Sequence, residues 1–187
     1  MGRLDGASAQ GLGGIVSEER ELLRETGAAA LVVPEELGGA GGELGDAAVV
    51  LEELGKALVP TPLLGTTLAE LALLAANEPD TDALERLAEG RAIGTVVFDP
   101  RYVVNGDVAD FVIAANGTTL SRWTSFTSHR VDAMDLTRRL ARLEPTDTVE
   151  IGDDPGLADI AAILLAAEQI GAAAKCLDMT VEYTKDR

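Results

Sequence analysis

The chain has 187 residues, 47% of them hydrophobic, and its 32 acidic and 15 basic residues give a formal net charge of −17. This length and composition predict a globular protein with its own core rather than a disordered chain. The negative charge argues against nucleic acid and anionic lipid as partners, because both carry charge of the same sign. A single cysteine, Cys176, excludes an internal disulfide and a cysteine-based zinc site.

The sequence shows no sign of a targeting or membrane segment. Residues 1–14 lack the apolar core of a signal peptide. The longest uninterrupted apolar run, residues 160–167, is far shorter than the ~20 residues that a membrane span requires. We therefore expect a cytoplasmic protein without a membrane partner.

The first 90 residues are predicted to form a helical domain. Apolar residues recur at spacings of three and four, the pattern of a helix with one buried face. The clearest such stripe consists of Leu44, Ala47, Ala48, Leu51, Leu54 and Leu58. Breaker residues divide this part into four expected helices, over residues 17–27, 43–58, 61–77 and 80–90. Ser17 is suited to cap the first helix and Gly27 to end it, and Asp82 and Glu85 have the spacing of a capping box.

Residues 31–58 run from an apolar segment through a glycine-rich loop into a helix, the order found in a dinucleotide-binding loop. Such a loop requires Gly-x-Gly-x-x-Gly directly between a strand and a helix. Gly39 and Gly41 have the first spacing, but Leu44 stands at the position of the third glycine. Glu35 and Glu36 precede the glycines, and their charges would repel a phosphate. We therefore predict a connection between two helices.

Residues 91–152 are predicted to form a small antiparallel β domain. Apolar and β-branched segments alternate here with turn signals such as "DPR" and "NG". The expected strands cover residues 92–99, 111–116, 118–126 and 147–151. Residues 132–145 are ambiguous, because they fit either a short helix or a loop that leads into an extended segment.

Residues 153–187 are predicted to form one long helix. Asp154 precedes Pro155, and proline is favoured at the first position of a helix. A helix of about 33 residues would be roughly 50 Å long. Its broad apolar stripe contains Ile160, Leu164, Ala167, Ile170, Gly171, Ala174, Leu177 and Val181. Small residues cover much of the surface, so this helix requires neighbouring helices to pack against.

Two segments resemble the acyl-CoA dehydrogenase family. "GAAALVVPEELGGAGGELGDAAVVLEELGKALVPTPLL" is similar to its N-terminal helical domain, and "AAEQIGAAAKCLDMTVEYTKDR" is similar to the first helix of its C-terminal bundle. The segments cover about a third of the chain in the family's order. The implied fold is α+β, with an N-terminal all-α domain (1–90), a small β domain (91–152) and the start of a C-terminal helical bundle (153–187). The "PTPLL" segment is most similar to actinobacterial members, some of which form unequal pairs that act on bulky acyl-CoA substrates.

The resemblance implies an oxidoreductase of lipid metabolism, in fatty acid or steroid degradation. Family members remove the α-proton of an acyl-CoA with a glutamate while the β-hydride passes to FAD. The electrons then pass from FAD to electron-transfer flavoprotein or a similar acceptor. The usual glutamate of the family lies beyond the position of Arg187, so no catalytic residue is assigned. Arg187 matches an arginine that contacts the FAD diphosphate of a neighbouring subunit, a role suited to a guanidinium. A homo- or hetero-oligomer is therefore implied.

The middle of the chain departs from the family pattern. The family holds flavin and substrate with a T-E-P-x-x-G-S-D loop and a W-I-T-N strand. Here Asp99 and Pro100 keep the acidic-Pro pair, Phe98 stands at the threonine position, and the rest is missing. We therefore expect a chain that is catalytically incomplete by itself. The alternatives are a non-catalytic partner subunit that shapes the acyl pocket, and a helical interaction domain outside the family.

The remaining polar residues offer little chemistry. His129, the single histidine, has no partners at suitable spacing, so we expect a surface residue and no metal site. Cys176 lies among alanines and is expected to be packed. The acidic pairs 35–36 and 52–53 are expected at a solvated edge or an interface. The one basic cluster, Arg138, Arg139 and Arg142, could meet a CoA phosphate or form structural salt bridges.

Overall fold

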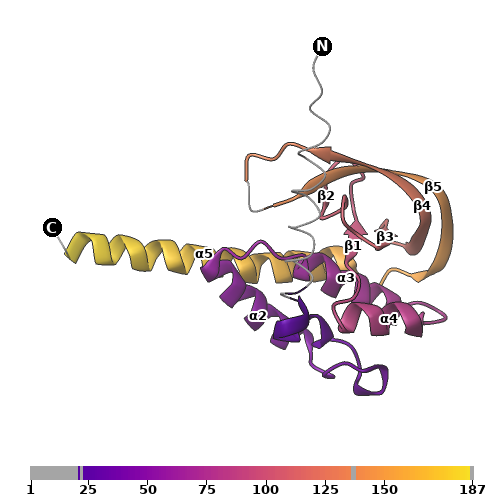
Figure 1. The fold of residues 1–187 in the computed structure, drawn as a ribbon, viewed down its shortest axis with the longest axis horizontal. Coiled ribbons are helices and arrows are strands. Elements are labelled where there is room, and N and C mark those ends of the chain that lie inside the picture. Colours follow the sequence, from indigo (N-terminus) through magenta and orange to yellow (C-terminus); the bar gives the residue numbers. More distant parts are fainter. Residues whose placement is uncertain (1–20, 22, 136–137, 186–187) are drawn as a thin grey trace, which may run out of the picture.

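The computed structural model describes residues 21, 23–135 and 138–185, which form a layer of helices, a sheet and one long helix (Figure 1). Residues 23–26 are helical, as expected, whereas Ser17 lies outside the described residues. Two short 3₁₀ helices, η1 (Ala28–Ala30) and η2 (Glu35–Leu37), precede three α-helices. These are α2 (Leu44–Ala57), α3 (Leu63–Leu74) and α4 (Thr81–Ala88), which confirms the predicted helical part.

The starts of two helices differ from prediction. The expected capping box at Asp82 and Glu85 is wrong, because α4 begins earlier and Asp80 Oδ1 accepts a hydrogen bond from the Ala83 amide at 3.0 Å. The long helix α5 (Leu157–Lys185) begins two residues after Pro155. There the Asp154 carboxylate accepts from the Leu157 amide at 2.9 Å, so it caps the helix instead of preceding a proline start.

The glycine-rich loop is a connection between helices, as predicted. Its amides are used within the loop: Gly39 donates to the Pro34 carbonyl at 3.1 Å and Gly41 to the Val33 carbonyl at 2.9 Å. A Cβ on Gly39 would lie 1.9 Å from the Val33 oxygen, so this close turn requires glycine. Because these donors face carbonyls, they are not available to a phosphate.

The sheet has five strands in the order β1-β3-β4-β5-β2. Their bounds are β1 (Gly94–Val97), β2 (Val103–Val104), β3 (Phe111–Ala115), β4 (Thr119–Val131) and β5 (Leu140–Asp153). The sheet is mixed rather than wholly antiparallel, because β1 and β3 are parallel. Residues 98–110 join these two strands, and this connection is long enough for the crossover that parallel strands need. It carries β2 to the far edge of the sheet, where β2 pairs with β5.

The two longest strands form a hairpin that curves away from the helices (Figure 1). Register shifts at Leu120/Ser121, Trp123/Ser125 and Ser125/Phe126 accompany this bend. Within the ambiguous residues 132–145, residues 132–135 and 138–139 are not helical and β5 begins at Leu140, so the alternative of a loop that leads into an extended segment is the correct one.

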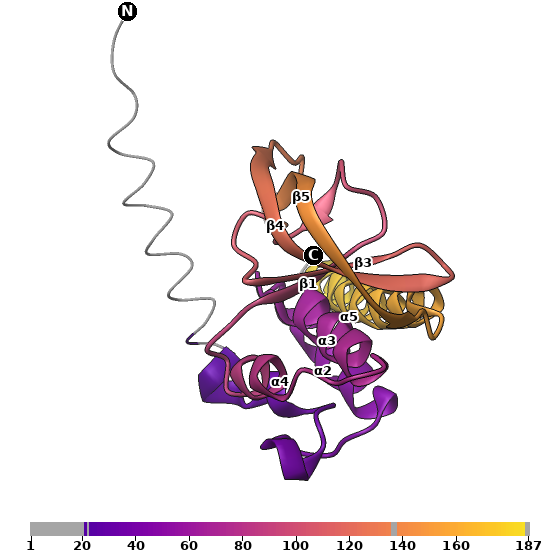
Figure 2. The ribbon, with the colours of Figure 1, turned by 90° about the vertical axis from the view of Figure 1, so that its right-hand side faces the viewer.

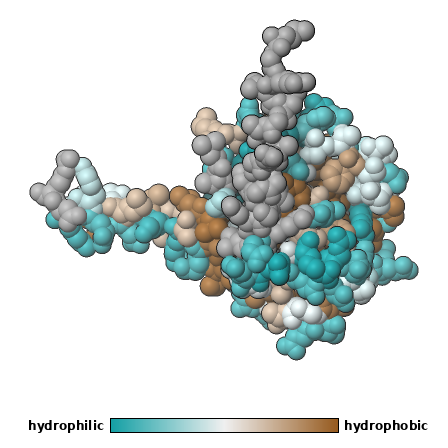
Figure 3. Space-filling view, viewed as in Figure 1, coloured by the Kyte–Doolittle hydropathy of each residue, from teal (hydrophilic) through white to brown (hydrophobic). Residues whose placement is uncertain are grey.

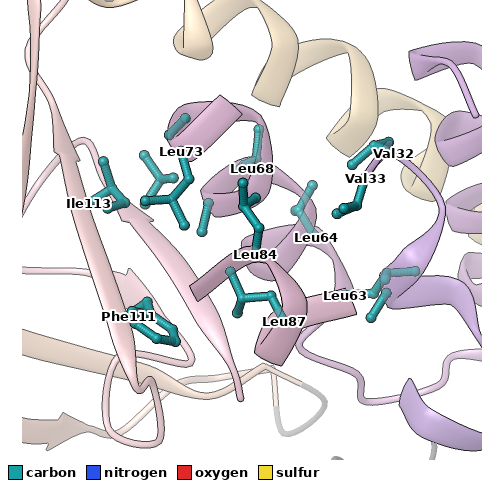
Figure 4. Close-up of a cluster of buried hydrophobic side chains, with 14 of the residues drawn as sticks. Val32, Val33, Leu63, Leu64, Leu68, Leu73, Leu84, Leu87, Phe111 and Ile113 are labelled. Carbon is teal, nitrogen blue, oxygen red and sulfur yellow. The ribbon is translucent and has the colours of Figure 1, made fainter. Parts of the chain in front are cut away.

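The core lies between the helices and one face of the sheet, an arrangement visible in both ribbon views (Figure 2). Helix α3 is its centre: Leu68 and Leu73 pack with Leu84 and Leu87 of α4 and with Ile113 of β3 (Figure 4). The opposite face of the sheet carries a smaller cluster, which contains Val97, Val103, Val112, Trp123, Ala141 and Leu143.

Helix α5 crosses α2 at close range and then leaves the body of the protein (Figure 1). Gly55 and Gly171 allow the crossing, since a Cβ on Gly171 would lie 1.9 Å from the Glu52 oxygen. Only Leu157, Leu164 and Gly171 of this helix are buried. Residues 175–185 are all exposed, and hydrophobic side chains gather where the helix departs (Figure 3). The expectation that Cys176 is packed is therefore wrong: its thiol is exposed, because nothing in the described chain covers this half.

Candidate cofactor turn and subunit interface

The segment from Phe98 to Tyr102 contains the acidic-Pro pair Asp99–Pro100, and the side chains of Asp99 and Arg101 in it bind each other. Asp99 accepts from Arg101 Nη2 at 2.6 Å and from the Arg101 amide at 2.9 Å. Hydrogen bonds from the Arg101 side chain lower the pKa of Asp99 to about 2. The Pro100 carbonyl accepts from the Leu143 amide at 2.8 Å, which ties the turn to β5. The turn therefore presents to solvent the aromatic rings of Phe98 and Tyr102, together with the ion pair between Asp99 and Arg101.

The basic cluster is divided among three acidic partners. Arg138 lies 2.6 Å from Glu168, Arg139 lies 2.6 Å from Asp107, and Arg142 lies 2.6 Å from Glu144. The Arg139 pair is largely buried, whereas the Arg142 pair is exposed. This pairing supports the structural alternative, because a guanidinium that is already neutralised attracts a phosphate less strongly.

The other candidates lie apart from one another. His129 is exposed on β4, as expected for a surface residue, and Glu35 and Glu36 are exposed on η2. Glu53 pairs with Lys56 at 2.5 Å on the solvent side of α2. Arg187, the predicted FAD contact, lies outside the described residues. Among the residues that the structure describes, no three potential metal ligands come together.

Glu70 was not predicted as a special residue, yet it is the most unusual side chain in the core. It is fully buried on α3, and neither carboxylate oxygen has a hydrogen-bond partner in the described chain. Burial alone raises its pKa well above the usual value. The signal in the sequence is a glutamate inside "LLGTTLAELALL", a segment that is apolar on nearly every side and therefore typical of a buried helix.

Helix α5 presents an apolar face to solvent, here called the outer stripe of α5: Ile163, Ala166, Ile170, Ala173 and Leu177. Its three large members recur every seven residues and are 53%, 60% and 64% exposed. Glu168, Lys175 and Glu182 also recur every seven residues, on another side of the helix. A seven-residue apolar repeat without charges is typical of a surface that packs against a second helix.

Comparison with known proteins identifies the family. Residues 13–91 match the acyl-CoA dehydrogenase N-terminal domain. The chain is 66% identical to the acyl-CoA dehydrogenase IpdE2 of Mycolicibacterium smegmatis over 168 residues, 90% of this chain. The chain belongs to the acyl-CoA dehydrogenase family. IpdE2 of Mycobacterium tuberculosis is also 66% identical over 168 residues, and this chain spans about half (53%) of the length of each IpdE2 protein.

Solved structures of acyl-CoA dehydrogenases share the fold. A variant of the Tcur3481–Tcur3483 steroid enzyme superposes with a TM-score of 0.77 at 24% identity, over 92% of this chain and 58% of that one. The ChsE4–ChsE5 complex of Mycobacterium tuberculosis gives a TM-score of 0.74 at 22% identity, over 100% of this chain and 69% of that one. The α+β arrangement predicted from the sequence, with helices, sheet and a final long helix, is thereby confirmed.

Acyl-CoA dehydrogenases generally bind FAD, but the turn at Phe98–Tyr102 does not fit a flavin in the family's manner. Phe98 replaces a hydroxyl side chain, and Asp99 and Arg101 bind each other. We therefore assign no flavin contact to this turn.

Proposed function

We propose that the chain is one subunit of a heteromeric acyl-CoA dehydrogenase, which oxidises the α,β carbon–carbon bond of an acyl-CoA thioester. The observation that carries this proposal is the outer stripe of α5, because an apolar face of this length requires a second helical surface. The first helix of a C-terminal bundle, as the resemblance implies, would have such a surface. ChsE4 and ChsE5 form a complex of two different chains, which supports a hetero-oligomer over a homo-oligomer.

In this proposal the chain is catalytically incomplete by itself. The reaction needs a base for the α-proton and FAD for the hydride, and neither is assigned to the described residues. Arg187 is proposed to contact the FAD diphosphate of a neighbouring subunit. The proposed acceptor of the electrons is electron-transfer flavoprotein or a similar protein.

A non-catalytic partner subunit is the second candidate, and the closed turn at Phe98–Tyr102 favours it. Such a subunit would support the acyl pocket of an active companion without holding a flavin of its own. The two candidates differ at Arg187, since only the first requires its guanidinium at the cofactor.

We propose a cytoplasmic location for either candidate. By length and composition alone α5 could cross a membrane, with a mean hydropathy of 1.6. However, its first half packs against α2 and α3, and Glu168 near its middle pairs with Arg138. A lipid environment would disrupt these polar contacts at high cost.

The test is to express the chain alone and together with a motif-complete acyl-CoA dehydrogenase chain from the same organism. We expect no flavin absorbance and no acyl-CoA-dependent dye reduction from the chain alone, and both from the co-purified complex. Tight FAD and full turnover in the isolated chain would overturn the proposal of incompleteness. A complex that keeps its FAD content and turnover when Arg187→Ala is introduced would favour the non-catalytic role.

A further inference from the structure

The turn between β3 and β4 contains Asn116–Gly117, one of the two Asn-Gly pairs in the sequence. In such a pair the backbone nitrogen of the glycine can attack the side-chain amide carbon of the asparagine, because glycine has no side chain to hinder the approach. The product is a five-membered succinimide, which water opens to aspartate or isoaspartate. The rate of this reaction in a folded protein depends on the groups that surround the two reacting atoms.

The attacking nitrogen of Gly117 is held against a carboxylate. Its N–H donates to Asp154 Oδ2 at 3.0 Å. The attack requires removal of this proton, and a carboxylate at hydrogen-bond distance can accept it as a general base. The N–H lies in the peptide plane, whereas the nitrogen attacks along the normal to that plane, so the hydrogen bond does not block the attack. The carboxylate is fixed in this position, because Asp154 Oδ1 accepts from the Leu157 amide at 2.9 Å and the Asp154 amide donates to the Thr118 carbonyl at 3.0 Å.

The side-chain amide of Asn116 is polarised by three hydrogen-bond donors. Its Oδ1 accepts from the Thr118 amide at 3.0 Å, from the Thr118 hydroxyl at 2.8 Å and from the Thr119 amide at 2.8 Å. Negative charge develops on this oxygen during the attack, and donors at about 2.7–3.1 Å are the arrangement that stabilises an oxyanion. The nitrogen that leaves is bound as well, since Asn116 Nδ2 donates to the Thr119 hydroxyl at 3.1 Å. The turn therefore stabilises the charge that the reaction creates.

The second pair, Asn105–Gly106, has a different environment. The Gly106 amide donates to the Val103 carbonyl at 3.3 Å, and a neutral carbonyl is a far weaker base than a carboxylate. Asn105 is only 5% exposed, whereas Asn116 and Gly117 are both exposed to the water that opens a succinimide. The same dipeptide thus occurs once with a carboxylate and once with a carbonyl as the acceptor of the glycine amide. This difference provides a comparison within one chain.

We propose that Asn116 is a site of self-catalysed deamidation, with Asp154 as the base. The Gly117 nitrogen forms a bond to Asn116 Cγ while its proton passes to Asp154 Oδ2. The bond from Cγ to Nδ2 then breaks, and the nitrogen takes up the proton through water and leaves as ammonia. One water molecule opens the succinimide, so the net reaction converts an amide and water into a carboxylic acid and ammonia.

The product changes the contact between the sheet and α5. A carboxylate at position 116 has the same charge as Asp154 and lies in the turn that is bound to it, so the two groups repel each other. In the isoaspartate form the main chain also passes through the side-chain carbon, which lengthens it by one methylene group. We therefore expect the hydrogen bond from the Gly117 amide to Asp154 to be lost, and with it one link between the β3–β4 turn and the start of α5.

The test compares the rate of deamidation in the folded chain with the rate in the same chain unfolded in urea, both at neutral pH. Mass spectrometry of the tryptic peptide 102–122, which contains both pairs, gives the rate at each asparagine. We expect Asn116 to react at least about ten-fold faster in the folded chain, and Asn105 to react more slowly there than in urea. An Asn116 that reacts equally fast or more slowly when folded overturns the proposal. Equal acceleration at Asn105 also overturns it, because the Gly106 amide does not face a carboxylate.

Variants separate catalysis from looseness of the turn. Asp154→Asn keeps an oxygen that can cap α5 but removes the base, so the reaction of Asn116 should slow at least about ten-fold. Thr118→Val, which removes one donor to the Asn116 oxygen, should slow it as well. Asp153→Asn, the same change at the exposed neighbouring residue, is the control and should leave the rate unchanged. An unchanged or faster reaction in Asp154→Asn contradicts the proposal, since a turn that merely protected Asn116 would release it when loosened.

Discussion

At the scale of single residues, Glu70 shows how a core can contain a carboxyl group without a partner. Its burial raises the pKa, so the side chain stays protonated and uncharged at pH values where an exposed glutamate is ionised. The sequence pattern identifies α3 as an apolar helix. It does not show that Glu70 is buried, because the exposure of a residue on α3 depends on which other elements cover that side of the helix. The same reasoning explains Cys176, where the alanine-rich surroundings suggested packing and the covering element is missing from the described chain.

We predict that Glu70→Gln changes how stability depends on pH. Below about pH 4.5 the carboxyl group is protonated in both the folded and the unfolded chain, so it adds no difference. As the pH rises, the unfolded chain ionises first, which lowers the free energy of unfolding by up to about 1.4 kcal/mol per pH unit until the folded pKa is reached. Urea unfolding at pH 5, 6 and 7 should show this loss in the wild type and a weaker pH dependence in Glu70→Gln. Parallel curves for the two proteins would contradict the prediction, and Glu36→Gln on the exposed η2 is the control.

At the scale of elements, the helices could be predicted and the sheet only in part. The apolar spacing of α2 and α4 is visible in the sequence, whereas β4 and β5 extend beyond the predicted strands. Residues such as Glu144 and Asp147 are exposed on the hairpin, so no alternation of apolar and polar side chains marks it. The parallel pairing of β1 with β3 depends on the path of the connection between them, which local patterns do not contain.

The crossing of α2 and α5 gives a prediction at this scale. Gly171→Ala places a methyl group 1.9 Å from the Glu52 oxygen, so the two backbones must separate. We expect a loss of about 1–3 kcal/mol in the free energy of unfolding, the usual cost of overpacking. Gly45→Ala is a matched control on α2, because its Cβ would meet nothing within 4 Å and should stabilise the helix by about 0.5–1 kcal/mol. Equal stabilities of the two variants in a thermal melt would show that the crossing is looser than described.

At the scale of the whole molecule, most of the candidate site was not predictable. The sequence led to the family and to the altered turn at Phe98, and the structure shows how Asp99 and Arg101 close that turn. A cavity beside Glu168 differs, because its lining residues come from three separate parts of the chain: the end of α2 with the residues that follow, Asp135 and Arg138, and the middle of α5. No local spacing connects these segments, so only the folded chain brings them together.

The outer stripe of α5 gives a prediction for the assembled molecule. Replacing both Ile170 and Leu177 with glutamate should leave the stability of the isolated chain within about 0.5 kcal/mol, because both side chains are exposed. The same double variant should lose affinity for the companion by at least about ten-fold, because charges would be buried in an apolar contact. Size-exclusion chromatography of the co-expressed chains measures this loss. Val149→Glu, at an exposed position on β5, should assemble normally, and a normally assembling double variant would rule out the stripe as the contact surface.

The backbone contact at Gly171 has a mechanical consequence. Fourteen residues of α5 lie on either side of this glycine, so the contact with α2 is at the midpoint of the helix and α5 could pivot about it. A tilt imposed on the free arm near Lys185 moves Leu157 by a similar amount in the opposite direction. Asp154, three residues before Leu157, accepts a hydrogen bond from the Gly117 amide at 3.0 Å, in the turn between β3 and β4. A chain bound to the exposed half of α5 could therefore transmit a displacement to the β3–β4 end of the sheet.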